Sequence, residues 1–301
     1  MRIAVTGANG LIGGEAVALL EQHEVLALGK GPCRIRPGPY TYVSADLGER
    51  GATATALAGF RAEAVLHAGA LTDVDACERD PDLAWRVNAE GTAEVARTCA
   101  SLGARLVALS TDYVFDGDAG PYAEDDLPNP RGAYARSKRC GEEAALLLAR
   151  DAAVARLAVV YGGRTPTRAT FASQVVEKLS RGEPVRAFHD QRVSTTLASA
   201  GAARCLELLL ETDYRGVLHA SDATVLDRVE LARRIAARFG LRGEIVPIAT
   251  ADARLLAPRP LRGGLEVDRA ISLLRNRPLE IGEALERFHR EWLERRGAGA
   301  G

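Results

Sequence analysis

The chain has 301 residues, of which 47% are hydrophobic and 26% charged, with a formal net charge of -1. These values are typical of a globular protein large enough to bury a sizeable core, and they exclude fibrous and intrinsically disordered chains. A net charge so close to zero creates no global field toward nucleic acid or anionic lipid, so we expect neither as a partner.

The first half of the chain alternates short apolar runs with longer stretches of helical spacing. The apolar runs fit strands that are buried on both faces of a parallel sheet. Alternation of this kind predicts right-handed crossovers and a doubly wound parallel α/β sheet, the Rossmann arrangement. The expected strands are Ile3–Val5, Val25–Leu28, Ala64–His67, Leu106–Ser110 and Val154–Leu157, and the expected helices are Leu11–Gln22, Asn88–Leu102 and Ala135–Arg150.

The pattern loosens after about residue 160, where Gly163 and Pro166 interrupt the chain. We therefore expect a first domain over residues 1–160 and a smaller C-terminal lobe over residues 161–301, with some segments of the lobe returning to the first domain. Within the lobe, Ser199 and Asp227 are the expected N-caps of two helices. The Pro-, Gly- and Arg-rich segment 247–264 is expected to loop over a site.

Three glycines follow the first strand and open the first helix. Gly7 permits a tight turn, Gly10 lets the backbone approach a pyrophosphate, and Gly13 lets helix and strand pack closely. The helix N-terminus then offers unpaired N–H groups to phosphates. A plain turn is the alternative, but the position between strand and helix favours a dinucleotide site in the first domain. The residues expected to contact the dinucleotide here are Gly7, Asn9, Gly10, Leu11, Ile12 and Gly13.

The end of the second strand bears on the choice of coenzyme. No acidic residue stands there to bond a ribose 2′-hydroxyl, as an NAD site would usually require. Lys30, Arg34 and Arg36 follow instead and could pair with the 2′-phosphate of NADPH, although they could also be solvated loop charges. We expect NADPH, with NADH possible. Asp46 and Leu47 follow a third expected strand and could reach the adenine.

Two further stretches carry candidate catalytic residues. Ser110–Tyr113 ends a buried strand, at the sheet edge that faces the ligand crevice in folds of this kind. Tyr134 and Lys138 lie one turn apart on a helix. A tyrosine with the ordinary pKa of about 10 is a poor acid, but a nearby ammonium lowers that pKa. Tyr134 could then exchange a proton with a ketone oxygen, which the hydroxyl of Ser110 or Thr111 could also bond, while a nicotinamide supplies the hydride.

The remaining features point to a reduced, metal-free chain. The five cysteines show no C-x-x-C spacing, and no cluster of histidines and carboxylates demands a metal. The N-terminus reads directly as a strand, and no apolar stretch is long enough to span a bilayer. We therefore expect a cytoplasmic protein with no membrane partner.

These motifs together resemble the extended short-chain dehydrogenases/reductases, and within them the dTDP-4-dehydrorhamnose reductases, over most of the chain. Ser110–Gly117 is the most diagnostic stretch, since it matches these reductases at almost every position. The other stretches that carry the resemblance are Val5–Gly10, His67–Asp75, Val87–Thr92, Asp190–Gln191 and Ala257–Leu261.

The resemblance implies that Thr111, Tyr134 and Lys138 are the catalytic residues. It implies NAD(P)H-dependent reduction of the 4-keto group of a nucleotide-linked deoxysugar, dTDP-4-dehydro-L-rhamnose, to dTDP-L-rhamnose. Many such proteins are homodimers, so a homodimer is possible. The loop after the fourth strand, at Ala68, Gly69 and Ala70, would contact the coenzyme together with Lys30, Asp46, Leu47, Tyr134 and Lys138. The substrate would contact Thr72, Asp73, Asp112, Tyr113 and Arg259.

Some residues depart from the reductase pattern. Val159 stands where a tryptophan is usual and Leu71 where a tyrosine is common, so the exact sugar and nucleotide stay open. A nucleotide-sugar epimerase with tightly bound NAD is an alternative, although the missing acid after the second strand and the pair of Asp112 and Tyr113 argue against it. A non-catalytic regulatory NADP-binding subunit is a third possibility, against which the intact Tyr134 and Lys138 weigh.

Overall fold

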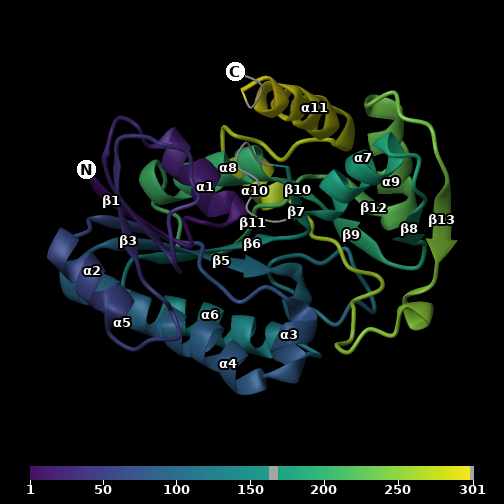
Figure 1. Cartoon of the computed structure of the whole chain (residues 1–301). Coiled ribbons are helices and arrows are strands. Elements are labelled where there is room, and N and C mark those ends of the chain that lie inside the picture. The colour runs from purple at the N-terminus through teal and green to yellow at the C-terminus, as the bar shows by residue number, and fades with distance from the viewer. Residues whose placement is uncertain (163–168, 299–301) are drawn as a thin grey trace.

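A parallel sheet of seven strands runs through the centre of the molecule (Figure 1), in the order β11-β6-β5-β4-β1-β2-β3. The computed structural model describes residues 1–162 and 169–298, so the interruption expected at Gly163 and Pro166 lies outside the described residues. The chain starts at β1 and builds the sheet outward in both directions, which confirms the expected doubly wound arrangement. The strands are β1 (Arg2–Thr6), β2 (Glu24–Gly29), β3 (Tyr40–Ser44), β4 (Ala64–His67), β5 (Arg105–Thr111), β6 (Ala152–Leu157) and β11 (Gly216–His219).

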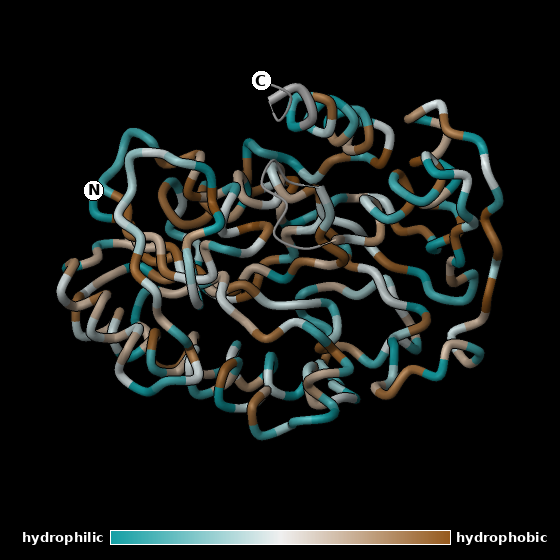
Figure 2. The backbone as a smooth tube through the Cα atoms, in the orientation of Figure 1, coloured by the Kyte–Doolittle hydropathy of each residue, from teal (hydrophilic) through white to brown (hydrophobic). Residues whose placement is uncertain are grey.

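Helices cover both faces of this sheet, because its strands carry apolar residues on both sides. Ile3 and Val5 of β1 pack toward α1 (Leu11–Leu19) and α8 (Ala198–Leu210), whereas Ala4 packs toward the opposite helices. Those helices are α2 (Ala52–Phe60), α5 (Gly91–Leu102) and α6 (Ala133–Leu148). The tube in Figure 2 is brown along stretches of the central strands, where these two cores lie.

A separate hydrophobic core holds the C-terminal lobe, at the right of Figure 1. Its helices are α7 (Phe171–Ser180), α9 (Arg228–Arg238) and α11 (Ile281–Ala298). Three two-stranded sheets accompany them: β7 (Val160–Tyr161) with β10 (Thr196–Leu197), β8 (Val185–Phe188) with β13 (Ile245–Ile248), and β9 (Arg192–Ser194) with β12 (Val225–Asp227). Two segments later in the chain than residue 160 belong to the first layer: β11 is the edge strand of the main sheet, and α8 packs on that sheet.

Short elements link these layers. They are α3 (Val74–Arg79), α4 (Pro81–Trp85), a π-helical turn at Arg86–Glu90, 3₁₀ turns at Asp112–Val114 and Thr250–Ala253, and α10 (Asp268–Leu273). Among the residues that the structure describes, no helix is both long and apolar enough to cross a membrane.

Two cap predictions in the lobe had opposite outcomes. Asp227 caps α9 as expected, since its carboxylate accepts a hydrogen bond of 2.8 Å from the backbone N–H of Glu230. The prediction for Ser199 is wrong, because α8 begins one residue earlier, at Ala198. The Ser199 hydroxyl is buried and donates instead to the Glu291 carboxylate of α11, at 2.5 Å.

Candidate active site

The glycine loop between β1 and α1 is a cradle without side chains. Gly7 has a φ of +66°, and a Cβ atom there would lie 2.5 Å from the backbone nitrogen of Gly69. A Cβ atom at Gly13 would lie 2.2 Å from the Gly7 carbonyl oxygen. Gly10, the N-cap residue of α1, offers no side chain to the first N–H groups of the helix. The loop therefore presents backbone and a helix N-terminus, which is the arrangement that binds a pyrophosphate.

Asn9 ties this loop to the segment that follows β2. Its amide donates to the carbonyl oxygens of Lys30 (3.2 Å) and Pro32 (3.0 Å) and to the Tyr42 hydroxyl (2.9 Å). Its side-chain oxygen accepts a 2.8 Å hydrogen bond from the backbone N–H of Arg34. Asn9 thus fixes the backbone that carries the basic residues singled out for a 2′-phosphate.

The structure pairs two of the expected coenzyme residues with each other. The Lys30 ammonium lies 2.7 Å from the Asp46 carboxylate, while 79% of the Lys30 side chain is exposed. The hydrogen bond to Asp46 raises the pKa of Lys30, and the same contact lowers the pKa of Asp46. The loop charge at Lys30 is therefore neutralised by a neighbour, but it stays accessible to a ligand. Arg34 and Arg36 are exposed on the same segment.

The loop after β4 closes the other side of the cradle. The backbone N–H of Gly69 donates to the Thr6 hydroxyl at 3.2 Å, and the Leu47 side chain packs so closely that a Cβ atom at Gly69 would lie 2.5 Å from it. His67 lies beneath this loop, with its ring between the Thr6 and Thr92 hydroxyls at 2.7 and 3.0 Å. Burial lowers the pKa of His67 to about 3, so the ring is neutral. Ala68 and Ala70 flank Gly69 on this loop.

Thr111 and Tyr134 meet at the carboxyl end of β5. Both are buried, and the Thr111 hydroxyl is a hydrogen-bond partner of the Tyr134 phenol. Ser110 directly precedes Thr111 on β5 and so faces the opposite side of the sheet, and its buried hydroxyl has no hydrogen-bond partner among the residues that the structure describes. Of the two hydroxyls that the sequence offered, the structure therefore brings Thr111 to the tyrosine.

The charges around Tyr134 differ from the sequence expectation. Burial is the main effect and raises the pKa of the phenol well above its ordinary value, and the Asp112 carboxylate raises this pKa further. The expected lowering of the Tyr134 pKa by Lys138 is not found. A neutral, buried phenol is a proton donor, which suits the reduction of a ketone.

Lys138 lies one turn beyond Tyr134 on α6, and it is almost fully buried. Its ammonium donates to the Leu109 carbonyl oxygen at 2.7 Å. Burial lowers the pKa of Lys138 to about 8, while the Glu142 carboxylate one further turn along acts against this shift. Asn88 supports the same helix, since its amide donates to the Ser137 hydroxyl at 3.0 Å.

Two supporting carboxylates had no signal in the sequence. Glu78 of α3 accepts a 2.8 Å hydrogen bond from the backbone N–H of Ala133, and so it caps the end of α6 that carries Tyr134. Glu142 forms a buried two-pronged pair with Arg156 of β6, at 2.8 and 2.9 Å. Both contacts join residues far apart in the chain, which is why local pattern could not find them.

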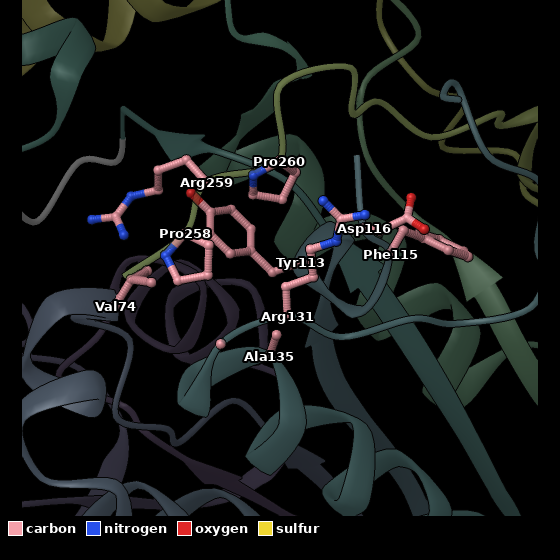
Figure 3. A pocket seen from close by; sticks show the side chains of 10 residues that line it. Val74, Tyr113, Phe115, Asp116, Arg131, Ala135, Pro258, Arg259 and Pro260 are labelled. Carbon is pink, nitrogen blue, oxygen red and sulfur yellow. The ribbon is translucent and has the colours of Figure 1, made fainter. Parts of the chain in front are cut away.

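On the substrate side, Asp112 and Tyr113 follow β5 in a 3₁₀ turn. Burial raises the pKa of Asp112 to about 6. The Tyr113 ring packs edge-on against Tyr134, with ring centroids 5.7 Å apart. Tyr113 also lines a pocket beside the loop that carries Pro258–Pro260 (Figure 3). The other residues that line this pocket are Val74, Phe115, Asp116, Arg131, Gly132, Ala135, Pro258, Arg259 and Pro260.

The other expected substrate residues are less close together. Arg259 lies in this pocket and pairs with Asp75 of α3, at 3.0 Å. Asp73 caps α3, since its carboxylate accepts a hydrogen bond of 2.9 Å from the backbone N–H of Ala76, and both Thr72 and Asp73 are exposed. The structure therefore brings Tyr113 and Arg259 into one pocket, whereas Thr72 and Asp73 lie outside it, at the N-terminus of α3.

The site as described has a backbone cradle beside a buried proton donor. Over residues 1–162 and 169–298 no group of three histidines, cysteines or carboxylates could hold a metal ion. One backbone feature is unusual: Val159, between β6 and β7, has a φ of +39°, which is rare for a β-branched residue. This is the position where the resemblance leads one to expect a tryptophan.

Comparison with known proteins gives consistent matches over nearly the whole chain. Residues 1–293 match the family described as RmlD substrate binding domain. A dTDP-4-dehydrorhamnose reductase from Mycobacterium tuberculosis is 37% identical over 86% of this chain and 82% of its own length. Methionine adenosyltransferase 2 subunit beta from Bos taurus is 29% identical over 93% of this chain and 85% of its own. A dTDP-4-dehydrorhamnose reductase from Bacillus anthracis, solved in complex with NADP, superposes with a TM-score of 0.82 at 26% identity, covering 96% of this chain and 99% of that one.

Proposed function

The chain belongs to the RmlD substrate binding domain family, and on that premise we propose that it is an NADPH-dependent reductase of a dTDP-linked 4-ketosugar. The substrate that the relatives favour is dTDP-4-dehydro-L-rhamnose, and the product is dTDP-L-rhamnose. The observation that carries the proposal is the burial of Thr111, Tyr134 and Lys138 together at the end of β5, beside the glycine cradle.

The coenzyme fits the residues of the cradle. A Cβ atom at Gly7 or Gly13 would collide with neighbouring backbone, so the tight fold of the loop requires glycine at both positions, and the α1 N-terminus has no side-chain cap. When bound, the dihydronicotinamide supplies a hydride to the carbonyl carbon. We expect Lys30, which is exposed beside Asp46, to pair with a 2′-phosphate. We assign coenzyme contacts to Gly7, Asn9, Gly10, Leu11, Ile12, Gly13, Lys30, Asp46, Leu47, Ala68, Gly69, Ala70, Tyr134 and Lys138.

The side chains of the site then supply the proton that the reduction needs. Tyr134 donates its phenolic proton to the carbonyl oxygen as that oxygen gains negative charge, and Thr111 bonds the same oxygen. The phenolate left on Tyr134 is stabilised by the Lys138 ammonium and takes up a proton from solvent. Ketone, hydride and proton together give the alcohol, so atoms and charge balance. Residues 1–160 would bind the coenzyme and residues 161–301 mainly the substrate.

A regulatory role without catalysis is the second candidate, because the bovine relative is named as a subunit of another enzyme. The test is the loss of dihydronicotinamide absorbance with dTDP-4-dehydro-L-rhamnose generated in place, with NADPH and NADH in parallel. Turnover that prefers NADPH supports the reductase. Binding of NADPH without turnover on any dTDP-4-ketosugar would favour the regulatory role, and NAD that copurifies with the protein would favour an epimerase. The homodimer stays a prediction.

A further inference from the structure

The segment over residues 254–259 passes beside the substrate pocket and is held to the rest of the protein by one side chain. Its Pro258 and Arg259 line the pocket drawn in Figure 3. Just after the segment the backbone is anchored again, since the Arg262 N–H donates to the Gly117 carbonyl oxygen at 2.7 Å. Over the part of the chain that the structure describes, every hydrogen bond and ion pair that joins residues 254–259 to another segment goes to Asp75 of α3.

Asp75 contacts the segment twice through the same oxygen. Its Oδ1 accepts a hydrogen bond of 3.0 Å from the backbone N–H of Ala257 and lies 3.0 Å from Nη2 of Arg259. Both side chains of this ion pair are largely buried, with 28% of Asp75 and 14% of Arg259 exposed. Pro258 and Pro260 have no backbone N–H to donate, so Asp75 meets two of the few donors that this stretch possesses.

These contacts orient Arg259 without using all of its donors. Its Nη1 donates to the Ala257 carbonyl oxygen at 2.9 Å, while Nη2 pairs with Asp75. Because a guanidinium carries five N–H groups, others remain for a ligand beyond these two contacts. Arg259 lines the same pocket as Tyr113, whose ring packs against the catalytic Tyr134. The pocket therefore has an oriented cation close to the reacting centre.

The helix that carries Asp75 also holds the catalytic helix. Glu78 follows Asp75 by three residues, so both lie on one side of α3, and it accepts the backbone N–H of Ala133 at the start of α6, at 2.8 Å. Gly132 lies between the two contacts, since a Cβ atom there would lie 3.2 Å from Oε2 of Glu78 and 3.6 Å from Cδ of Pro258. The segment 254–259 and the helix of the proton donor are thus fixed against the same short helix.

We propose that Asp75 is a positioning residue, which holds the segment 254–259 against α3 and thereby sets Arg259 in the pocket for the diphosphate of the nucleotide sugar. This inference rests on the proposed reductase function. A diphosphate suits the pocket because a guanidinium pairs with phosphate oxygens through two parallel N–H groups. Asp75 contributes without touching the substrate, since a side chain that is already ordered loses less conformational entropy when the ligand binds.

The test separates KM from kcat. Asp75→Asn keeps an oxygen that can accept the Ala257 N–H but removes the charge that orients Arg259. The KM for the dTDP-linked ketosugar should rise about three- to tenfold, the equivalent of one long side chain that binding must now order. The kcat and the NADPH affinity should stay within about twofold, because the contacts of Tyr134 are unchanged. A KM that stays the same or falls would overturn the proposal, as would a loss confined to kcat.

A double-variant cycle shows whether Asp75 acts through Arg259. Arg259→Met should itself raise KM, and adding Asp75→Asn should raise it little further, because the same interaction cannot be lost twice. Increases that simply multiply would show that Asp75 does not act through Arg259. Asp82→Asn, the same substitution at an exposed position of α4, is the matched control and should leave KM unchanged. If Asp75→Asn does not fold, Asp75→Glu keeps the charge but displaces it, and the same cycle applies.

A binding measurement separates this inference from the proposed function. Calorimetry with dTDP-L-rhamnose needs no turnover. If the protein reduces no ketosugar yet binds dTDP-L-rhamnose, and Asp75→Asn weakens that binding, then the reductase proposal fails and this one stands. If the unchanged protein and Asp75→Asn bind it equally tightly, the role of Asp75 is refuted whatever the activity. If the unchanged protein does not bind it at all, both proposals fail.

Discussion

The coenzyme end and the substrate end of the candidate active site differ in the groups that form them. The coenzyme end, around Gly7, Gly13 and Gly69, is made of backbone that comes close because side chains are absent. The substrate end, around Tyr113 and Arg259, is made of side chains from segments far apart in the chain that meet in one pocket. Backbone geometry is therefore determined by a few neighbouring residues, whereas the arrangement of side chains in a site depends on how distant elements pack.

Tyr134 lies between the two ends, and its replacement should have the largest effect on activity. Tyr134→Phe removes the proton donor but keeps the buried ring and its packing against Tyr113. We expect kcat to fall by about a hundred- to ten-thousandfold, the usual contribution of a general acid. NADPH affinity, measured by coenzyme fluorescence, should stay within about twofold. Unchanged turnover would remove Tyr134 from the mechanism.

At the coenzyme end, adding a single methyl group should weaken both stability and coenzyme binding. Gly7→Ala places a Cβ atom 2.5 Å from the backbone nitrogen of Gly69 and requires a positive φ. The strain should cost about 1–3 kcal/mol and weaken NADPH binding by at least about tenfold. Gly59→Ala is the control, since a Cβ atom there meets nothing within 4 Å. Equal effects of the two changes, by thermal unfolding and coenzyme titration, would contradict the account of the cradle.

The dependence of activity on pH tests the support beneath the site. Burial lowers the pKa of Lys138 to about 8, so kcat should fall as the pH rises through about 8 and the ammonium is lost. The groups that face Lys138 are the Leu109 carbonyl oxygen, the neutral His67 ring and the Glu142 carboxylate. Because the Glu142 charge holds the pKa of Lys138 up, Glu142→Gln should move this fall to lower pH.

That variant needs a partner and a control. Glu142→Gln alone leaves the buried Arg156 charge without its partner, which should destabilise the fold by about 3–5 kcal/mol. Combining it with Arg156→Met should restore folding while keeping the pH shift. Glu143→Gln, one residue along and half exposed, should leave the pH profile unmoved. A profile that does not shift in the double variant would show that Glu142 acts on packing alone.

The exposed pair at Lys30 should show the smallest effect on stability. Since 79% of the Lys30 side chain is exposed, breaking its pair with Asp46 should change the free energy of unfolding by less than about 1 kcal/mol. We expect Lys30→Met to reduce the preference for NADPH over NADH by about tenfold through loss of a phosphate contact. Arg50→Met, which breaks another exposed pair, should change neither quantity. An unaltered coenzyme ratio would assign the 2′-phosphate to other residues.

The sequence predicted those features of the structure that residue type and spacing alone determine. The glycine spacing predicted the cradle, and the Tyr134 to Lys138 interval predicted that both residues share one face of a helix, as α6 shows. Short apolar runs between helical stretches predicted five strands of the sheet and its doubly wound arrangement. Each of these features depends on contacts within a few residues or on a simple period.

The features that could not be predicted depend on packing between distant elements. Ser199 has the residue type of a helix cap, but the burial of Glu291 against it decided its partner. The direction of the Tyr134 pKa shift was expected to be downward, and it is upward because the sequence does not report the degree of desolvation. Glu78 carries no motif, and only the packing of α3 against the start of α6 reveals that it accepts the backbone N–H of Ala133.

The central claim is that this chain delivers a hydride from NADPH to the C4 carbon of a nucleotide-linked ketosugar. The most direct measurement supplies NADPH deuterated at the transferring position, with dTDP-4-dehydro-L-rhamnose, and locates the label in the product by mass spectrometry and NMR. The account predicts one deuterium per sugar, at C4, and labelling with Tyr134→Phe that is slower by the same factor as its kcat. A sugar that changes configuration without taking up deuterium would contradict the account and identify an epimerase, whose hydride comes from the sugar itself.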